Sequence, residues 1–369
     1  MGIKTLPALA GADRVVERLL EHLPGDLECC IYLVKGRQVR QLKSDASRHY
    51  VYLPALPGKH LRAFSFFALC TMHALVRSDY SIVHAHNSDF GVFCSLLRLK
   101  RNVRIVGTFH GNPYQRKKWG TVARWYLRTS EWFFVHSCHV LTSVARSNSE
   151  TYQQMYGRDV HYIPNGVDTF VPPDQNARFD CSKMGLRPGG YFMFACGRVD
   201  ATKGLHHVIS AYKRGKWTEN LFIVGDFNHD KQYSEAMDME VAGEPGIVVQ
   251  KTLLPRMILL DAIRQCRLFV FPSEVEAMSM VLLEAIAAGC PVVCSDIPEN
   301  RDVVGEDYEY LFHSGDANDL RRVMGVALSD PDARSIAERL HRRCVQTFAW
   351  DSIAQRYLRL YNSLQRSSP

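Results

Sequence analysis

The sequence lacks the segments that mark membrane-spanning and secreted proteins. In the aromatic-rich part of its N-terminal half, the longest uncharged run is residues 63–76, and these 14 residues fall short of the roughly 20 needed to cross a bilayer. The N-terminus has no basic start followed by an apolar stretch and a cleavage site, so secretion is not expected. The 11 cysteines form no CxxC pair and no Cys/His zinc spacing. We therefore expect free thiols in a reducing cytoplasm.

Motifs for dinucleotides and nucleic acids are missing as well. No GxGxxG follows any expected strand, and no nucleic-acid-binding motif or internal repeat is visible. A dinucleotide-binding or nucleic-acid-binding protein is thus the less favoured class. With 369 residues, 46% apolar and 22% charged, the composition is that of a globular chain of about two domains.

Positive charge is concentrated in the first half of the chain. Residues 1–168 hold 22 Lys and Arg against 12 Asp and Glu, whereas the remainder holds 23 against 26. A cationic half suits an anionic partner such as a phosphate-bearing substrate or a phospholipid surface.

Short apolar runs alternate with amphipathic stretches along the chain, which is typical of doubly wound parallel sheets in the α/β class. The expected strands are residues 81–85, 103–109, 139–142, 160–163, 191–196, 220–224, 268–271 and 291–294. The expected helices include residues 13–23, 61–76, 90–99, 205–212 and 281–288. Such sheets bind ligands at the carboxyl ends of their strands, so the loops there are the candidate sites.

The alternation stops in a segment dense in Pro, Gly, Asn and Asp, which predicts an interdomain linker. We expect two Rossmann-like domains facing each other across a cleft. The predicted divisions are an N-terminal domain of residues 1–168, a linker of 169–190, a C-terminal domain of 191–348 and a closing segment of 349–369.

The loop at residues 197–204, GRVDATKG, runs from an expected strand into an expected helix. Gly197 lets the backbone approach a ligand, and the helix N-terminus supplies free amides. With Arg198 and Lys203, the loop suits a diphosphate. The alternative is a solvated loop with two surface cations.

Two carboxylates flank the start of the next helix. Glu276 lies in the turn before it, and Glu284 lies inside it among apolar neighbours, where an unpartnered carboxylate is costly. A polyol ligand would satisfy both, and the alternative is a cap residue with a Glu at the edge of the core.

The spacing of these two glutamates within PSEVEAMSMVLLEAIAAGCPVV resembles the signature of retaining glycosyltransferase family 4, which has the GT-B fold. The resemblance extends over nearly the whole chain, through LPALAGADRVV, VHAHN, TFHG, IPNGVD, GRVDATKG, LFIVGD, SDIPENRDVVGEDYEYLF and a closing helix at Trp350 that would return to the N-terminal domain. The stretch HGNPYQRKKWGTVARWYL is similar to bacterial enzymes of surface-polysaccharide synthesis, lipopolysaccharide included, and to rhamnosyltransferase-like members.

The resemblance implies a function for each matching residue. A nucleotide-sugar donor would be bound through Gly11, Gly197, Arg198, Lys203, Asp226, Phe227, Glu276, Ser279, Met280, Val281, Leu282 and Glu284. Catalysis would involve His110, Glu276, Arg198 and Lys203, and the acceptor side His84, His86, Asn87 and Asn112. No metal is expected, because the cations of the loop at residues 197–204 can neutralise the diphosphate.

Three departures from the family pattern are present. The first loop has Ala10-Gly11 in place of a glycine pair, EAMS replaces the commoner EGFG, and VVQKTLLP lacks a glycine after its strand.

The activity that the resemblance implies is transfer of a hexose or deoxyhexose to a lipid-linked or polysaccharide acceptor. A GT-B epimerase or hydrolase is the alternative.

Cations and aromatic residues mix between residues 116 and 134. This composition suits a membrane interface with anionic lipid, so we expect a cytoplasmic protein that docks peripherally on the inner face of the membrane. The alternative is an ordinary helix packed by its aromatic side chains.

Overall fold

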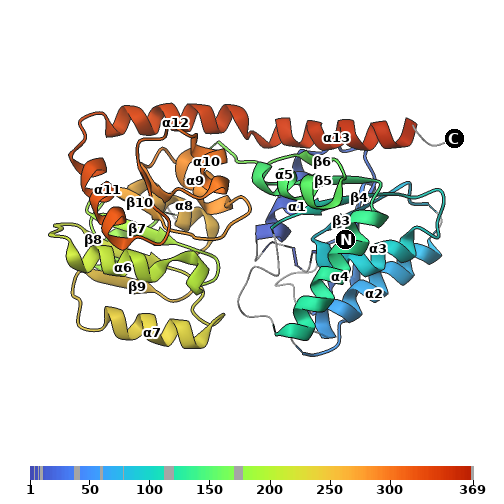
Figure 1. Ribbon diagram of the computed structural model, residues 1–369, viewed down its shortest axis with the longest axis horizontal. Coiled ribbons are helices and arrows are strands. Elements are labelled where there is room, and N and C mark those ends of the chain that lie inside the picture. The colour runs from blue at the N-terminus through green and yellow to red at the C-terminus, as the bar shows by residue number, and fades with distance from the viewer. Residues whose placement is uncertain are drawn as a thin grey trace. The chain divides into compact units, whose positions relative to one another are not determined.

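Two compact units make up the chain in the computed structural model (Figure 1). Unit 1 comprises Met1–Gly166 and Trp350–Pro369, and unit 2 comprises Val167–Ala349. The structure describes residues 1–3, 5, 6, 8, 11–36, 42–58, 61–77, 79–111, 120–169 and 178–366. Within these ranges, no helix combines the length and apolar character needed to cross a membrane.

Unit 1 is built on a four-stranded parallel sheet in the order β3-β4-β5-β6. These strands are β3 (Ile82–His86), β4 (Arg104–Phe109), β5 (Val140–Ser143) and β6 (Val160–Tyr162). A separate parallel pair joins β1 (Cys29–Val34) to β2 (Arg48–Leu53). The backbone of Met1 runs beside β3, because its carbonyl accepts a hydrogen bond of 2.9 Å from the N–H of His86.

Helices pack around the strands of unit 1. They are α1 (Gly11–His22), α2 (Leu61–Val76), α3 (Gly91–Leu97), α4 (Thr121–Ser137), α5 (Arg146–Tyr156) and, from the far end of the chain, α13 (Trp350–Arg366). Helices α3 and α4 approach very closely at Gly91, where a Cβ atom would lie 1.7 Å from the carbonyl oxygen of Ser130. Only glycine fits at this contact.

Helix α13 is part of unit 1 although unit 2 precedes it in the chain (Figure 1). Its first residue, Trp350, is buried, and a Cβ atom on Gly166 would lie 2.3 Å from the Trp350 ring. Near its other end, the hydroxyl of Tyr361 lies 2.7 Å from Nδ1 of His84. The helix therefore completes the packing of unit 1.

Unit 2 contains a six-stranded parallel sheet in the order β12-β11-β10-β7-β8-β9. Its strands are β7 (Tyr191–Ala195), β8 (Asn220–Val224), β9 (Ile247–Gln250), β10 (Leu268–Phe271), β11 (Val292–Ser295) and β12 (Leu311–Phe312). The direction of strand addition reverses between β7 and β10. This reversal is the switch point at which open α/β sheets bind ligands.

Seven helices flank the sheet of unit 2 within the described ranges. They are α6 (Leu205–Arg214), α7 (Lys231–Val241), α8 (Arg256–Gln265), α9 (Met280–Ala287), α10 (Pro298–Val304), α11 (Ala317–Ser329) and α12 (Ala333–Thr347). Residues 170–177 of the expected linker lie outside the described ranges. Farther on, the N–H of Phe179 donates to the buried carboxylate of Asp261 at 2.9 Å, which holds this segment within unit 2.

The structure confirms the doubly wound α/β architecture expected from the sequence. Strands β8 and β10 and helix α2 have the expected bounds, and the other expected strands are displaced by a residue or two. Strands β1, β2 and β12 were not among those expected, and β9 was expected only through the family resemblance, as the strand in VVQKTLLP. In β2 the sequence RHYVYL carries polar residues and is half-buried except at His49, which is exposed, and β12 has only two residues. Neither therefore has the continuous apolar run of a central parallel strand.

We expect Gly91→Ala to destabilise unit 1, because the added methyl group would overlap the backbone of α4. Overpacking of this kind costs about 1–3 kcal/mol, and thermal unfolding followed by circular dichroism measures the loss. Gly25→Ala is the matched control, since a Cβ atom there meets no atom within 4 Å. Equal unfolding midpoints for the two variants would contradict the contact.

Candidate active site

The loops that follow β7 and β10 meet at the switch point of unit 2. Nζ of Lys203, from the first loop, lies 2.6 Å from Oε1 of Glu276, from the second. Their side chains are only 19% and 13% exposed, so the ion pair is largely shielded from solvent. The N–H of Glu274 also donates to the carbonyl of Thr202 at 2.9 Å. The two loops are thus held together by backbone and side chains.

Gly204 allows this close approach. Its φ is +69° at the start of α6, and a Cβ atom would lie 2.3 Å from the carbonyl oxygen of Pro272. Asp200 caps the preceding turn, Ala201–Lys203, by accepting a hydrogen bond of 3.0 Å from the N–H of Thr202. The N-terminus of α6 therefore begins next to Lys203, where the positive end of the helix dipole favours an anion.

Arg198 and Gly197 lie in the same loop. Gly197 is exposed, and a Cβ atom on it would meet nothing within 4 Å. The half-buried side chain of Arg198 makes no hydrogen bond or ion pair with any described residue. It is therefore a cation, in the loop expected to bind the diphosphate, whose charge no described carboxylate neutralises.

Glu284 has a cationic partner that the sequence did not indicate. Its side chain is 4% exposed, and Oε1 lies 3.1 Å from Nη2 of Arg256 at the start of α8. The same Nη2 lies 3.2 Å from Asp168. The buried carboxylate expected to need a ligand is thus already paired. The arginine was missed because it comes 28 residues earlier in the chain.

The remaining residues expected to bind the donor lie at the ends of neighbouring strands. Ser279 caps α9 by accepting a hydrogen bond of 3.4 Å from the N–H of Leu282. Met280 and Val281 are half-buried in the first turn of this helix, whereas Leu282 is fully buried in the core. After β8, Asp226 is half-buried and Phe227 is buried.

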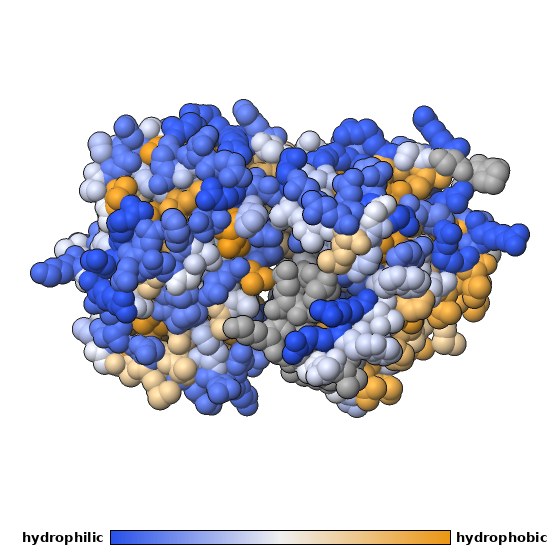
Figure 2. Space-filling model, in the orientation of Figure 1, coloured by the Kyte–Doolittle hydropathy of each residue, from blue (hydrophilic) through white to orange (hydrophobic). Residues whose placement is uncertain are grey.

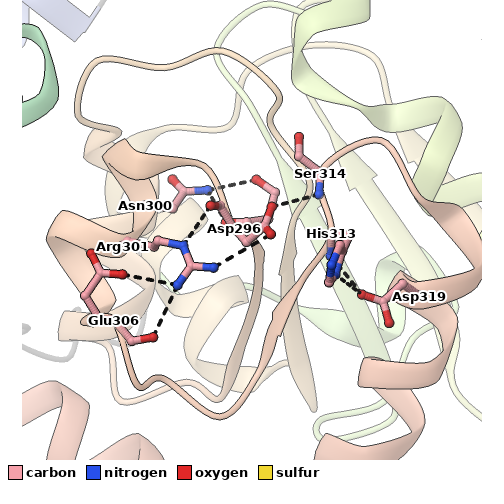
Figure 3. Close-up of polar contacts among 8 residues, drawn as sticks. Asp296, Asn300, Arg301, Glu306, His313, Ser314 and Asp319 are labelled. Carbon is pink, nitrogen blue, oxygen red and sulfur yellow. Dashed lines mark hydrogen bonds and ion pairs between the residues drawn. The ribbon is translucent and has the colours of Figure 1, made fainter. Parts of the chain in front are cut away.

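The loop after β11 is fixed by a set of polar contacts (Figure 3). Nδ2 of buried Asn300 donates to the carbonyl of Ser295 at 3.0 Å, and the Ser295 hydroxyl donates to the carbonyl of Ser273 beyond β10. Asp296 accepts a hydrogen bond of 2.9 Å from the N–H of Ser314, and Arg301 donates to its backbone carbonyl (Figure 3). These contacts connect the loops after β10, β11 and β12.

Histidines gather at the carboxyl edge of the sheet of unit 1. Nδ1 of His86 lies 2.9 Å from Nε2 of His110, and His84 bonds both Thr108 and Tyr361 at 2.7 Å. Burial lowers the pKa of His110 to about 4 and lowers the pKa values of His84 and His86 well below 6.5. The three imidazoles are therefore neutral at pH 7, which makes them hydrogen-bonding groups rather than cations.

Asn87 follows β3 with a φ of 76°, the one positive value for a non-glycine residue among those described. Strained backbone of this kind clusters at ligand sites. Gly11 is exposed at the start of α1, and no atom lies within 4 Å of the position of a Cβ atom. Asn112, the fourth residue expected on the acceptor side, lies outside the described residues.

Within unit 2 the expected donor-binding residues thus fall at the ends of parallel strands, and within unit 1 the expected acceptor-side histidines lie at one edge. Sequence reasoning missed Arg256 and Asp168, and it also missed Tyr361, which reaches His84 from a position 277 residues away. A buried Glu is a signal that a partner exists, but it does not say which residue that is.

Two family models match the chain. Residues 9–170 match the model described as Glycosyltransferase Family 4, and residues 178–343 match the one described as Glycosyl transferases group 1. Among curated proteins, the alpha-maltose-1-phosphate synthase of Mycolicibacterium smegmatis is 25% identical over 77% of this chain and 79% of its own length. An Escherichia coli UDP-Gal:alpha-D-GlcNAc-diphosphoundecaprenol alpha-1,3-galactosyltransferase is 21% identical over 94% of this chain and 92% of its own length.

Solved structures share the fold. The sucrose-phosphate synthase of Thermosynechococcus elongatus superposes with a TM-score of 0.81 at 19% identity, covering 96% of this chain and 93% of its own. HepE of Anabaena, in complex with UDP and glucose, gives a TM-score of 0.77 at 16% identity over 98% of both chains. The fold of this chain is therefore that of the GT-B enzymes.

The buried histidines predict that acid destabilises unit 1. A histidine that is neutral when folded takes up a proton on unfolding below pH 6.5, so stability falls as the pH drops from 6.5 towards 4. The free energy of unfolding falls by at most about 1.4 kcal/mol per pH unit for each such histidine. Unfolding midpoints measured from pH 7 to pH 5 should fall less steeply in His110→Phe. The exposed His161 provides a control, His161→Gln, that keeps the wild-type slope.

Proposed function

The chain belongs to glycosyltransferase family 4, and from this premise we propose that it is a retaining enzyme using a nucleotide-diphosphate sugar. The sugar would be a hexose or deoxyhexose, and the acceptor a lipid-linked or polysaccharide glycan. The observation that carries this proposal is the shielded Lys203–Glu276 pair at the N-terminus of α6. It brings a cation for a diphosphate and a carboxylate for sugar hydroxyls within 2.6 Å of each other.

The diphosphate is the leaving group, so negative charge grows on it in the transition state. Fixed cations and helix amides stabilise that charge more than they stabilise the ground state. In our proposal Arg198 and Lys203 supply the cations, and the N-terminus of α6 supplies the positive end of its dipole. Lys203 has three N–H donors, so it can bond a phosphate oxygen while Glu276 keeps it in position. The reaction then needs no metal.

The two glutamates serve different parts of the donor in this proposal. Glu276 accepts hydrogen bonds from the hydroxyls of the transferred sugar, and Glu284 accepts them from the ribose. Arg256 orients Glu284 through its contact of 3.1 Å. Asp226 and Phe227, after β8, would lie beside the base, and Ser279 to Leu282 would add backbone contacts.

Transfer breaks the bond between the anomeric carbon and the diphosphate oxygen, and a new bond forms to the acceptor oxygen on the same face. The acceptor proton passes to the departing phosphate oxygen, so no carboxylate nucleophile is required. Neutral His110 would hydrogen-bond the sugar or the acceptor, and His86 would fix the orientation of its ring across 2.9 Å. The relatives named above are synthases and transferases, which does not favour the alternative of an epimerase or hydrolase.

An exposed apolar stripe on unit 1 supports membrane docking. Helix α2 has Leu61, Phe64, Met72 and Val76 on its solvent face, each between 48% and 86% exposed. Figure 2 shows apolar surface at the lower right, over the position of α2 in Figure 1. Solvent-facing apolar side chains at helical spacing are typical of helices that bind a bilayer surface.

Helix α4 adds tryptophans and cations to this surface. Trp125 and Trp132 are 69% and 50% exposed, and Arg124 and Arg128 are exposed beside them. Phe64 of α2 packs against Tyr126 of α4 with ring centroids 6.4 Å apart, so the two helices are neighbours. We therefore propose peripheral docking on anionic lipid at the cytoplasmic face. Eleven free cysteines suit that reducing compartment.

A donor panel tests the proposed activity. A UDP-, GDP- or dTDP-sugar should raise the unfolding temperature of the wild type through binding to the folded state.

Arg198→Ala, Lys203→Ala and Glu284→Gln should each reduce transfer at least about tenfold, equal to about 1.4 kcal/mol. Arg322→Ala, at an exposed position on α11, is the control. If all three variants keep wild-type turnover, the site assignment is wrong.

Vesicle sedimentation tests docking. We expect binding to vesicles that contain anionic phospholipid, and the double variant Met72→Ser, Trp125→Ser should bind at least about tenfold more weakly, because each large apolar side chain contributes about 1.5–3 kcal/mol when buried. Met239→Ser, at a residue 73% exposed in unit 2, is the control. Absence of wild-type binding to any vesicle, anionic or neutral, would refute docking.

A further inference from the structure

Two histidines and a glutamate converge beside the phosphate-binding loop and are used by no step proposed above. His206 and His207 form the first turn of α6, and Glu274 lies in the loop after β10. Oε1 of Glu274 is 2.9 Å from Nε2 of His207 and 3.9 Å from Nε2 of His206. Three groups with metal-binding chemistry therefore point at one small volume.

The spacing of these atoms suits a tetrahedral cation. The three ligand atoms lie within 4.8 Å of one another. Bonds of 2.0–2.1 Å to a tetrahedral zinc ion place neighbouring ligand atoms about 3.3 Å apart, a value between the two separations from Glu274. Both separations from Glu274 differ from this value by less than an ångström. Solvent can reach a fourth position, because the His206 and Glu274 side chains are 37% and 40% exposed.

A neighbouring hydroxyl fixes one of the rings. The oxygen of Tyr233 lies 2.7 Å from Nδ1 of His206 and accepts a hydrogen bond of 3.2 Å from the N–H of the same residue. When Nδ1–H donates to this oxygen, Nε2 presents its lone pair towards Glu274. Metal-bound histidines are commonly held in this way through their second nitrogen.

The carboxylate of Glu274 also favours a cation. Among the described residues, Glu274 has no lysine or arginine partner, since Lys203 pairs with Glu276. Burial lowers the pKa of His206, a charge on His207 would lower it further, and the nearby Glu274 raises it. The ring centroids of these histidines are only 3.9 Å apart, so double protonation is costly. A carboxylate and two imidazoles are the ligands that borderline divalent metals prefer.

We propose that His206, His207 and Glu274 bind one divalent transition-metal ion of the zinc class. The ion would connect the first turn of α6 to the loop after β10, in addition to the hydrogen bond from Glu274 to Thr202. It stabilises the two loops without contacting the reacting atoms. The inference does not rest on the proposed function, because transfer should persist in EDTA while metal binding is lost.

Cobalt titration tests the site. Tag-free full-length protein, stripped with EDTA and exchanged into chelator-free buffer, is titrated with Co²⁺ and followed by visible absorption, with stoichiometry from calorimetry. We expect one ion per chain, a tetrahedral spectrum, and a Zn²⁺-dependent rise in unfolding temperature. His207→Gln and Glu274→Gln should weaken binding at least tenfold, whereas His313→Gln, in the two-residue pair with Asp319, should not.

The outcomes distinguish metal binding at these three residues from metal binding by cysteines and from no metal binding. Variants that fold like the wild type without metal, yet lose Co²⁺ binding, support the site. Equal affinity in all variants would overturn it, and so would a strong near-ultraviolet charge-transfer band, because that band marks thiolate ligands and would move the ion to the cysteines. Absence of any Co²⁺ or Zn²⁺ binding by the wild type would also refute it.

Discussion

The ion pair between Lys203 and Glu276 joins the two loops on which the candidate site depends. It forms because the sheet of unit 2 changes its direction of strand addition between β7 and β10, so the ends of these strands lie next to each other. The loops can then touch because residue 204 is glycine, where a Cβ atom would overlap the backbone of Pro272. Lys203 and Glu276 are 73 residues apart in sequence, and only a parallel sheet of this order brings them within hydrogen-bonding distance.

Much of this arrangement could be predicted from the sequence. Central strands such as β8 and β10 are continuous apolar runs bounded by turn residues, so their positions follow from composition and length. Strand β2 could not be identified in this way, because RHYVYL is only half-buried and alternates polar with apolar side chains. The alternation of strands and helices predicted a parallel sheet, but it did not predict the order of the strands, and so the switch point between β7 and β10 was not predicted.

The candidate site was predictable in its residue types but not in its pairings. The loop GRVDATKG and the two glutamates could be identified from local sequence, yet the partner of Glu284 could not. Arg256 meets that carboxylate because α8 packs against α9, and a tertiary contact of this kind leaves no pattern in a single sequence. The apolar face of α2 was hidden for a related reason: a helix that is apolar all round looks like a core helix until its neighbours are known.

The position of α13 has a consequence for biosynthesis. Unit 1 needs Trp350 and Tyr361 to complete its packing, yet a ribosome makes these residues only after all of unit 2. Domains that emerge first usually fold first, but here the earlier unit must wait for the last helix while the later unit has its full sequence sooner. A nascent chain stalled before residue 350 would therefore carry a finished second half and an incomplete first half, with the surface that α13 covers open to chaperones.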